Sequence, residues 1–66
     1  MMNKLKETRE KALMTQPDLS DKTGLTVATI SRIERGHRRP HFVTQRRLAR
    51  ALKVSVEELG FDGKVD

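Results

Sequence analysis

Seven arginines lie within nineteen positions in the middle of this 66-residue sequence. They are Arg32, Arg35, Arg38, Arg39, Arg46, Arg47 and Arg50. A guanidinium group forms planar, paired hydrogen bonds with phosphate oxygens and base edges. Residues 32–53 carry +7 (eight bases, one acid), residues 1–31 carry +1 (five bases, four acids), and residues 54–66 carry −3. This distribution suggests a nucleic acid as partner, although a solvated basic face that maintains solubility explains the charge equally well.

No residues have the spacing of a catalytic or metal site. His37 and His41 are four positions apart, which binds metal on a helix, but Pro40 breaks that geometry and no acid or thiol completes the shell. The serines have no triad context, and the adjacent acids Glu57 and Glu58 are expected to be solvated. We therefore predict no enzyme activity, no metal and no cofactor.

The length and composition describe one small basic domain. The net charge is +5, and there is no cysteine for a disulfide or a thiolate metal cluster. The longest apolar run is Ala12-Leu13-Met14, whereas a membrane span needs about 20 apolar residues. We expect a cytoplasmic protein with its domain at residues 1–60 and a short tail at 61–66. A chain this short buries only about 60% of its unfolded surface, so self-association would add stability.

Capping residues and glycines predict five short helices, the first at about residues 3–13. Thr15 is a good N-cap for the second helix, with Asp18 in a capping-box position and Pro17 in the first turn. Gly24 can take the left-handed conformation that ends this helix.

The third helix is predicted at about residues 27–35, between the N-cap Thr26 and Gly36. A basic loop through Pro40 follows, because the residue before a proline is driven toward extended geometry. The fourth helix is expected to bury one side, consisting of Phe42, Leu48, Ala49 and Leu52. The fifth begins with a capping box of Ser55 and Glu58 and ends near Gly60.

Two short helices joined by a turn containing glycine, followed by another glycine and a basic loop, form the helix-turn-helix arrangement. The residues that carry it are Thr15-Gln16, Leu19, Gly24, Ile30-Ser31-Arg32-Ile33-Glu34-Arg35-Gly36, Pro40, Leu48-Ala49, Leu52 and Val54-Ser55. This pattern resembles the Cro and phage-repressor family of DNA-binding domains over about residues 3–59. The resemblance implies a compact, all-α, five-helix fold like that of lambda repressor, with the third helix in the DNA major groove.

The resemblance places Val27, Ala28 and Arg32 toward base edges. Residues beside an N-cap reach furthest into a groove about 12 Å wide, and an arginine can donate two bonds to guanine. Small apolar side chains can touch a thymine methyl. Val27 also lies three residues before Ile30 and could extend the buried stripe instead.

The resemblance also implies a set of phosphate contacts. These are Gln16, Thr26, Thr29, Arg35, Arg38, Arg39 and His41. Backbone amides at the start of the fourth helix would add to them. The alternative is that Gln16 is an ordinary first-turn residue and that Arg38 and Arg39 are solvated at a loop tip.

Three positions depart from the family pattern by carrying polar residues, so fewer apolar side chains are available for the core. Ser20 stands where alanine is usual and needs a partner, such as the carbonyl four residues back. Gln45 replaces a leucine, and Thr8 replaces an apolar residue. The resemblance also brings Arg9 and Glu34 together, and we predict that they form a partly buried ion pair.

A homodimer is expected to form through the C-terminal third of the chain. Val56, Phe61 and Val65 have no obvious internal partner, and apolar residues left over on a small domain can be buried against a second copy. The alternative is that Phe61 folds back over the fifth helix.

The sequence thus predicts a small transcriptional regulator that binds double-stranded DNA as a dimer on a pseudo-palindromic operator. The rival hypothesis is a protein-interaction module, such as an antitoxin-like partner with secondary autoregulatory DNA binding. A membrane-surface protein is less favoured because no helix shows Trp or Phe opposite a Lys/Arg face. No small-molecule effector is evident, and the operator and the sign of regulation cannot be read from the sequence.

Overall fold

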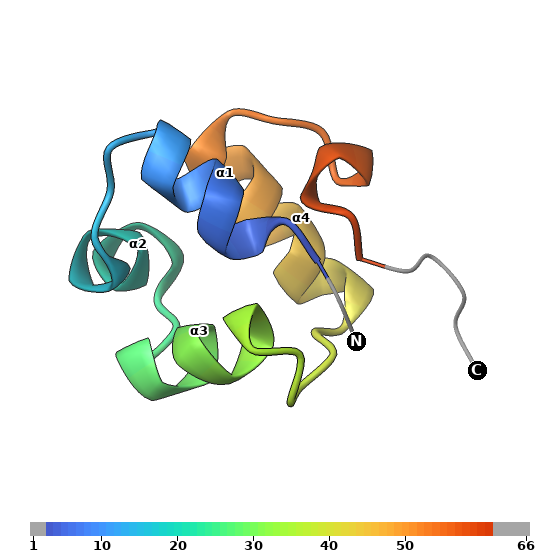
Figure 1. Cartoon of the computed structure of the whole chain (residues 1–66), viewed down its shortest axis with the longest axis horizontal. Coiled ribbons are helices and arrows are strands. Elements are labelled where there is room, and N and C mark those ends of the chain that lie inside the picture. Colours follow the sequence, from blue (N-terminus) through green and yellow to red (C-terminus); the bar gives the residue numbers. More distant parts are fainter. Residues whose placement is uncertain (1–2, 62–66) are drawn as a thin grey trace.

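The computed structural model describes residues 3–61 and contains four α-helices followed by a short 3-10 helix (Figure 1). These are α1 (Leu5–Lys11), α2 (Gln16–Thr23), α3 (Val27–Glu34), α4 (Phe42–Leu52) and η1 (Glu57–Leu59). In Figure 1, α3 lies at the bottom of the molecule, and α1 and the end of α4 lie above it. The all-helical fold class is confirmed.

The helix ends on either side of the α2–α3 turn are those that the sequence predicts. Thr15 and Asp18 form the reciprocal capping box, and Gly24 ends α2 in the left-handed conformation with φ 78°. The Thr26 hydroxyl accepts a hydrogen bond from the Thr29 N–H and caps α3. These caps satisfy backbone donors that a helix leaves without partners in its first turn.

The expected count of five helices is not confirmed, because the fifth element is only a 3-10 turn. Ser55 and Glu58 do exchange the hydrogen bonds of a capping box, at 3.3 and 2.8 Å, but the turn they begin is a 3-10 helix of three residues. Gly60 stops it immediately by taking a left-handed conformation, with φ 69°. The first helix is also shorter than expected and covers residues 5–11.

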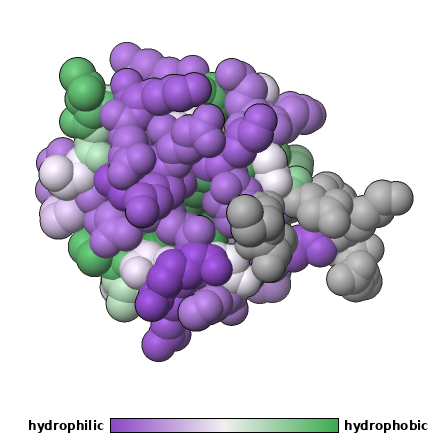
Figure 2. Space-filling view, in the orientation of Figure 1, coloured by the Kyte–Doolittle hydropathy of each residue, from purple (hydrophilic) through white to green (hydrophobic). Residues whose placement is uncertain are grey.

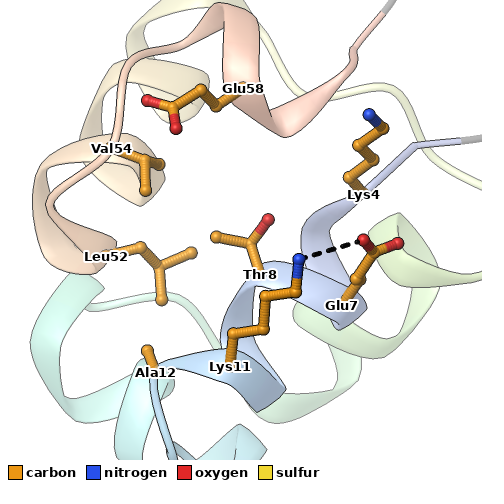
Figure 3. A pocket seen from close by; sticks show the side chains of 8 residues that line it. All are labelled: Lys4, Glu7, Thr8, Lys11, Ala12, Leu52, Val54 and Glu58. Atoms are coloured by element: carbon orange, nitrogen blue, oxygen red, sulfur yellow. Dashed lines mark ion pairs between the residues drawn. The ribbon is translucent and has the colours of Figure 1, made fainter.

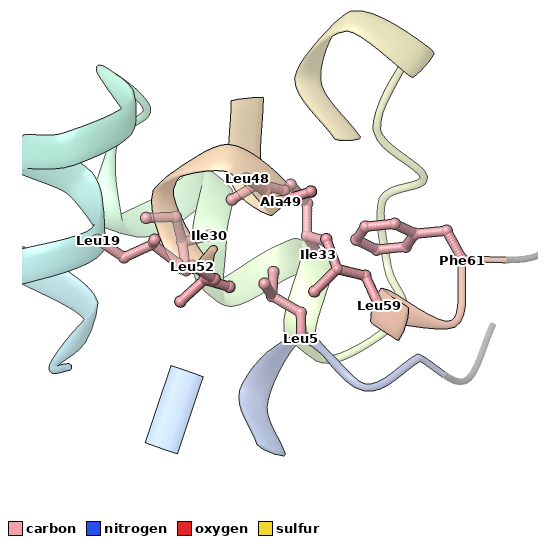
Figure 4. Close-up of a cluster of buried hydrophobic side chains, with 9 residues drawn as sticks. All are labelled: Leu5, Leu19, Ile30, Ile33, Leu48, Ala49, Leu52, Leu59 and Phe61. Carbon is pink, nitrogen blue, oxygen red and sulfur yellow. The ribbon is translucent and has the colours of Figure 1, made fainter. Parts of the chain in front are cut away.

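The core lies where all five elements meet (Figure 4). Its buried members are Leu5, Leu19, Ile30, Ile33, Leu48, Ala49, Leu52, Leu59 and Phe61. Burial of about 25 cal/mol for each Å² of apolar surface makes these side chains the main stabilising contribution. Val54 and Val56 are half-buried against this cluster.

The two phenylalanines lie in the opposite surroundings from those expected: Phe42 is exposed and Phe61 is buried. Phe42 was expected in the core, but it is 59% exposed and its ring lies 5.8 Å from the guanidinium carbon of Arg46. Phe42 is the first residue of α4, and the buried side of that helix begins one turn later, at Gln45. Phe61 is only 7% exposed and fills the core instead.

Phe61 therefore has the internal partners that the dimer hypothesis assumed it lacked. The turn at Gly60 directs it back into the core, and the Lys4 N–H donates to the Leu59 carbonyl at 2.8 Å beside it. Phe61, which the sequence analysis assigns to the tail, is thus part of the core. Val56 is half-buried, and Val65 lies outside the described residues.

Two of the three polar residues that depart from the family pattern, Ser20 and Gln45, form hydrogen bonds through their side chains. Ser20 donates to the carbonyl of Leu25, not to the carbonyl four residues back. Gln45 is buried and donates through Nε2 to the Pro40 carbonyl at 3.0 Å. Each bond offsets the cost of burying a polar group and fastens a loop to a helix.

The predicted ion pair between Arg9 and Glu34 is present. Arg9 Nε lies 2.6 Å from Glu34 Oε2, and the two side chains are only 10% and 4% exposed. The pair joins α1 to the last residue of α3.

We expect Phe61→Ala to lower the free energy of unfolding by about 3 kcal/mol or more, because it removes a large core side chain. Phe42→Ala is the matched control. Its exposed ring predicts a loss within about 1 kcal/mol. Urea denaturation of the two variants measures both values, and equal losses would contradict the exchanged places of the rings.

Removing one partner of a buried ion pair typically costs about 3–5 kcal/mol, because the other charge stays buried without compensation. We therefore expect Arg9→Met and Glu34→Gln each to destabilise the domain strongly. The double variant should lose less than the two single losses added together, because neither charge is left alone. If each single variant melts within a degree or two of the wild type, the pair contributes little.

Candidate nucleic-acid interface

Three hydrogen bonds fix the turn that joins α2 to α3. The Thr23 hydroxyl donates to the Leu19 carbonyl at 2.8 Å and accepts from the Leu25 N–H at 3.2 Å. Arg47 of α4 donates to the Thr23 carbonyl at 3.3 Å. The turn that precedes α3 is thus held both by α2 and by α4. The sequence placed Arg47 in the basic cluster but gave no sign that it would reach this carbonyl.

One side of α3 is buried in the core and the opposite side is exposed. Ile30 and Ile33 are completely buried, whereas Val27, Ala28 and Arg32 are exposed. Val27 is 39% exposed, so it does not continue the buried stripe. The three residues predicted to contact bases therefore share the accessible side of the helix, two of them next to its N-cap.

The carboxylate of Glu34 holds the far end of α3. Its Oε2 accepts from Arg9 Nε, and its Oε1 accepts from Arg9 at 3.2 Å and from Gln16 Nε2 at 3.0 Å. Arg9 also donates to the Met14 carbonyl at 2.8 Å. The hydrogen bond to Glu34 raises the pKa of Arg9 above its usual value. Arg9 therefore keeps its positive charge at any physiological pH.

A similar bond acts at the start of α2. The Thr15 backbone N–H donates to the carboxylate of Asp18 and holds the pKa of that carboxyl below its usual range. The charged form is also favoured by the positive end of the helix dipole. The capping box is therefore intact at neutral pH.

The residues predicted to contact phosphate have different surroundings. Gln16 is half-buried and bonded to Glu34, and the Thr26 and Thr29 hydroxyls are bonded to each other at 3.0 Å. Arg35, on the exposed surface, donates to the Ser31 carbonyl at 3.4 Å.

Beyond α3, the predicted phosphate contacts lie along the loop to α4. Arg38 and His41 are exposed and Arg39 is half-buried. His41 is the N-cap of α4 and makes no side-chain capping bond. The most hydrophilic area in Figure 2 lies at the bottom of the view, over the end of α3 and this loop. The structure thus leaves Arg38 and His41 accessible in the segment that directly follows α3.

Asn3 was not singled out from the sequence, yet it helps to hold α3. Its side-chain oxygen accepts from the Leu5 N–H, and its amide donates to the Ile33 carbonyl at 2.8 Å. One side chain therefore joins the start of α1 to the last turn of α3.

Residues 3–61 hold neither a candidate metal site nor a candidate membrane span. No group of three histidine, cysteine or acidic side chains is arranged to hold a metal ion. No helix in this part of the chain has both the length and the apolar character needed to cross a membrane.

A family model described as helix-turn-helix matches residues 5–59, which is most of the chain. No curated protein and no solved structure matches the sequence. The matched segment runs from the first residue of α1 to the last residue of η1 and includes the α2–turn–α3 unit. The chain therefore belongs to the helix-turn-helix family of the Cro and phage-repressor type, a family of DNA-binding transcription regulators.

Proposed function

We propose that the protein is a transcriptional regulator that binds specific double-stranded DNA sequences with α3 in the major groove. The observation that carries this proposal is that α3 is buried on one side and accessible on the other. Its buried isoleucines and Glu34 fix the helix, and its accessible side presents Val27, Ala28 and Arg32 together. A rigidly held helix can present such side chains in one orientation.

Arg32 is the principal base-reading residue in this proposal. Its guanidinium group is suited to the N7 and O6 acceptors of guanine. Val27 and Ala28, in the first turn of α3, are suited to contact with thymine methyl groups. The combination would read only a few base pairs.

The phosphate contacts would surround this reading surface. A side-chain amide has two N–H groups, so Gln16 can keep its bond to Glu34 and offer the second to a phosphate. Thr26, Thr29, Arg35, Arg38, Arg39 and His41 complete the set. Phosphate contacts of this kind fix the position of the protein without reading sequence.

A homodimer would supply the additional specificity that one short helix lacks. Because Phe61 is in the core, the exposed apolar surface nearest the basic loop is Phe42 and Val43 at the start of α4. We propose that these two residues, with Val56, contribute to a dimer whose recognition helices lie about 34 Å apart on DNA.

DNA binding by this protein should weaken as the salt concentration rises. If a dimer contacts about eight phosphates, log K plotted against log salt concentration should have a slope of about −7 on duplex DNA. Fluorescence anisotropy with a random-sequence duplex measures this slope. A flat salt response would exclude nucleic acid as the partner.

Arg38→Ala should weaken binding to all sequences alike and reduce that slope by about 2, one phosphate for each protomer. Lys6→Ala is the control, since it removes the same charge from α1. If both variants change the slope equally, the effect reflects net charge and not a contact near α3.

Arg32→Ala should cost about 1–3 kcal/mol on the preferred site and relax the preference at one base pair. Selection of bound sequences from a random DNA pool, performed with the wild type and the variant, identifies that base pair. An unchanged preference would remove Arg32 from the reading surface.

A further inference from the structure

Arg47 links α4 to the turn between α2 and α3. Its Nη1 donates to the carbonyl of Thr23, the last residue of α2, at 3.3 Å. Carbonyls in the last turn of a helix have no partner within the helix, and an arginine there donates to them and matches the negative end of the helix dipole. The guanidinium group also lies against the turn itself, because a Cβ at Gly24 would be 3.9 Å from Nη1. Arg47 thus binds the turn at the point where α2 ends.

The turn between Thr23 and α3 is short and is ordered by local hydrogen bonds. Thr23 is buried, and its hydroxyl accepts from the Leu25 N–H. The Gly24 N–H donates to a carbonyl of α2 at 2.8 Å, and Thr26 caps α3. These bonds lie within the α2–turn–α3 unit, whereas the bond from Arg47 comes from outside it. The local bonds shape the turn, and Arg47 relates the turn to α4.

The backbone of α4 runs close to that of α2 but approaches that of α3 at few points. At its last turn, α4 faces α1 across a hollow of about 400 Å³, which Leu52 lines from α4 and Thr8 and Ala12 line from α1 (Figure 3). The turn that Arg47 holds is therefore a direct link between the positions of α4 and α3.

Both ends of this link carry residues of the proposed DNA interface. α3 presents Arg32 on its exposed side, and Arg38 and His41 lie in the segment that leads into α4. Base recognition requires side chains to be held within about 0.5 Å of one geometry, whereas the attraction to phosphates carries no sequence information and lets proteins slide along DNA. A loose turn would therefore reduce discrimination between sequences more than it reduces general affinity for DNA.

We propose that Arg47 is a positioning residue for sequence discrimination: its bond to Thr23 fixes α3 relative to α4 and so aligns the base-reading side chains with the phosphate contacts. This role rests on the proposed function, since it requires α3 to read bases. Arg47 differs in this respect from the other arginines of α4. The guanidinium group of Arg46 lies over the ring of Phe42 in the same helix, and the exposed Arg50 side chain forms no hydrogen bond or ion pair with residues 3–61.

Arg47→Met and Arg50→Met form a matched pair of variants for testing this role. Each removes one positive charge from the exposed side of α4, and methionine keeps the helix propensity of arginine. Fluorescence anisotropy measures the affinity of each variant for a random-sequence duplex and for the preferred duplex selected from the random pool. We expect both variants to change random-sequence binding by the same factor.

Arg47→Met should in addition lower the ratio of preferred to random-sequence affinity, whereas Arg50→Met should keep the wild-type ratio. The reduction can reach about tenfold, because a lost hydrogen bond can shift the turn between arrangements by no more than its own free energy. A substitution that merely destabilised the fold would lower both affinities in proportion and leave the ratio unchanged.

Amide hydrogen exchange of the free protein gives a second measurement, which does not involve DNA. In Arg47→Met the amide protons of Gly24 and Leu25 should exchange several-fold faster than in the wild type, while those of α1 keep their rates, because the turn loosens without unfolding of the domain. Arg50→Met should leave both sets of rates unchanged.

Arg47 does not have this role if Arg47→Met keeps the wild-type affinity ratio, if Arg50→Met lowers the ratio equally, or if the amides of the turn exchange at the wild-type rate. A wild type that binds random DNA but prefers no sequence contradicts the proposed function, and the role of Arg47 in base reading with it. That failure appears in the wild type, whereas a failure of the positioning role alone appears only in the comparison of the two variants.

Discussion

The carboxylate of Glu34 is the group on which the arrangement of the first three helices depends. It stands on the last residue of α3 and receives hydrogen bonds from Arg9 of α1 and Gln16 of α2. Removing a charge from water is costly, and these three donors compensate for it only when all three helices are in place. The pair therefore favours one packing of the helices over alternatives. The accessible side of α3 depends on this buried bond at its opposite end.

The α2–α3 unit was predictable because its signals are local. A threonine N-cap, a glycine in the left-handed conformation and the next threonine N-cap lie within twelve residues, and each acts on the backbone beside it. Such signals do not depend on the rest of the fold. The accessible positions Val27, Ala28 and Arg32 follow once the buried positions Ile30 and Ile33 are identified, because the helical period relates them.

The parts that escaped prediction depend on contacts between distant segments. Phe42 and Phe61 are equally apolar, and only the turn at Gly60 and the packing of η1 decide which ring enters the core. The bond from Arg47 to the Thr23 carbonyl joins residues 24 positions apart. The left-handed backbone that follows α1 is at Leu13, where the sequence offers no glycine to signal it. Apolar character and charge do not contain this information.

The bond between the Lys4 N–H and the Leu59 carbonyl has a consequence for how the domain opens. It joins the start of α1 to the end of η1, so the first and last elements are not free to fray independently. A small domain closed in this way should unfold as one cooperative unit. The amide proton of Lys4, although near one end of the chain, would then exchange with solvent only when the whole domain opens. A residue whose position suggests a loose terminus thus becomes a reporter of global stability.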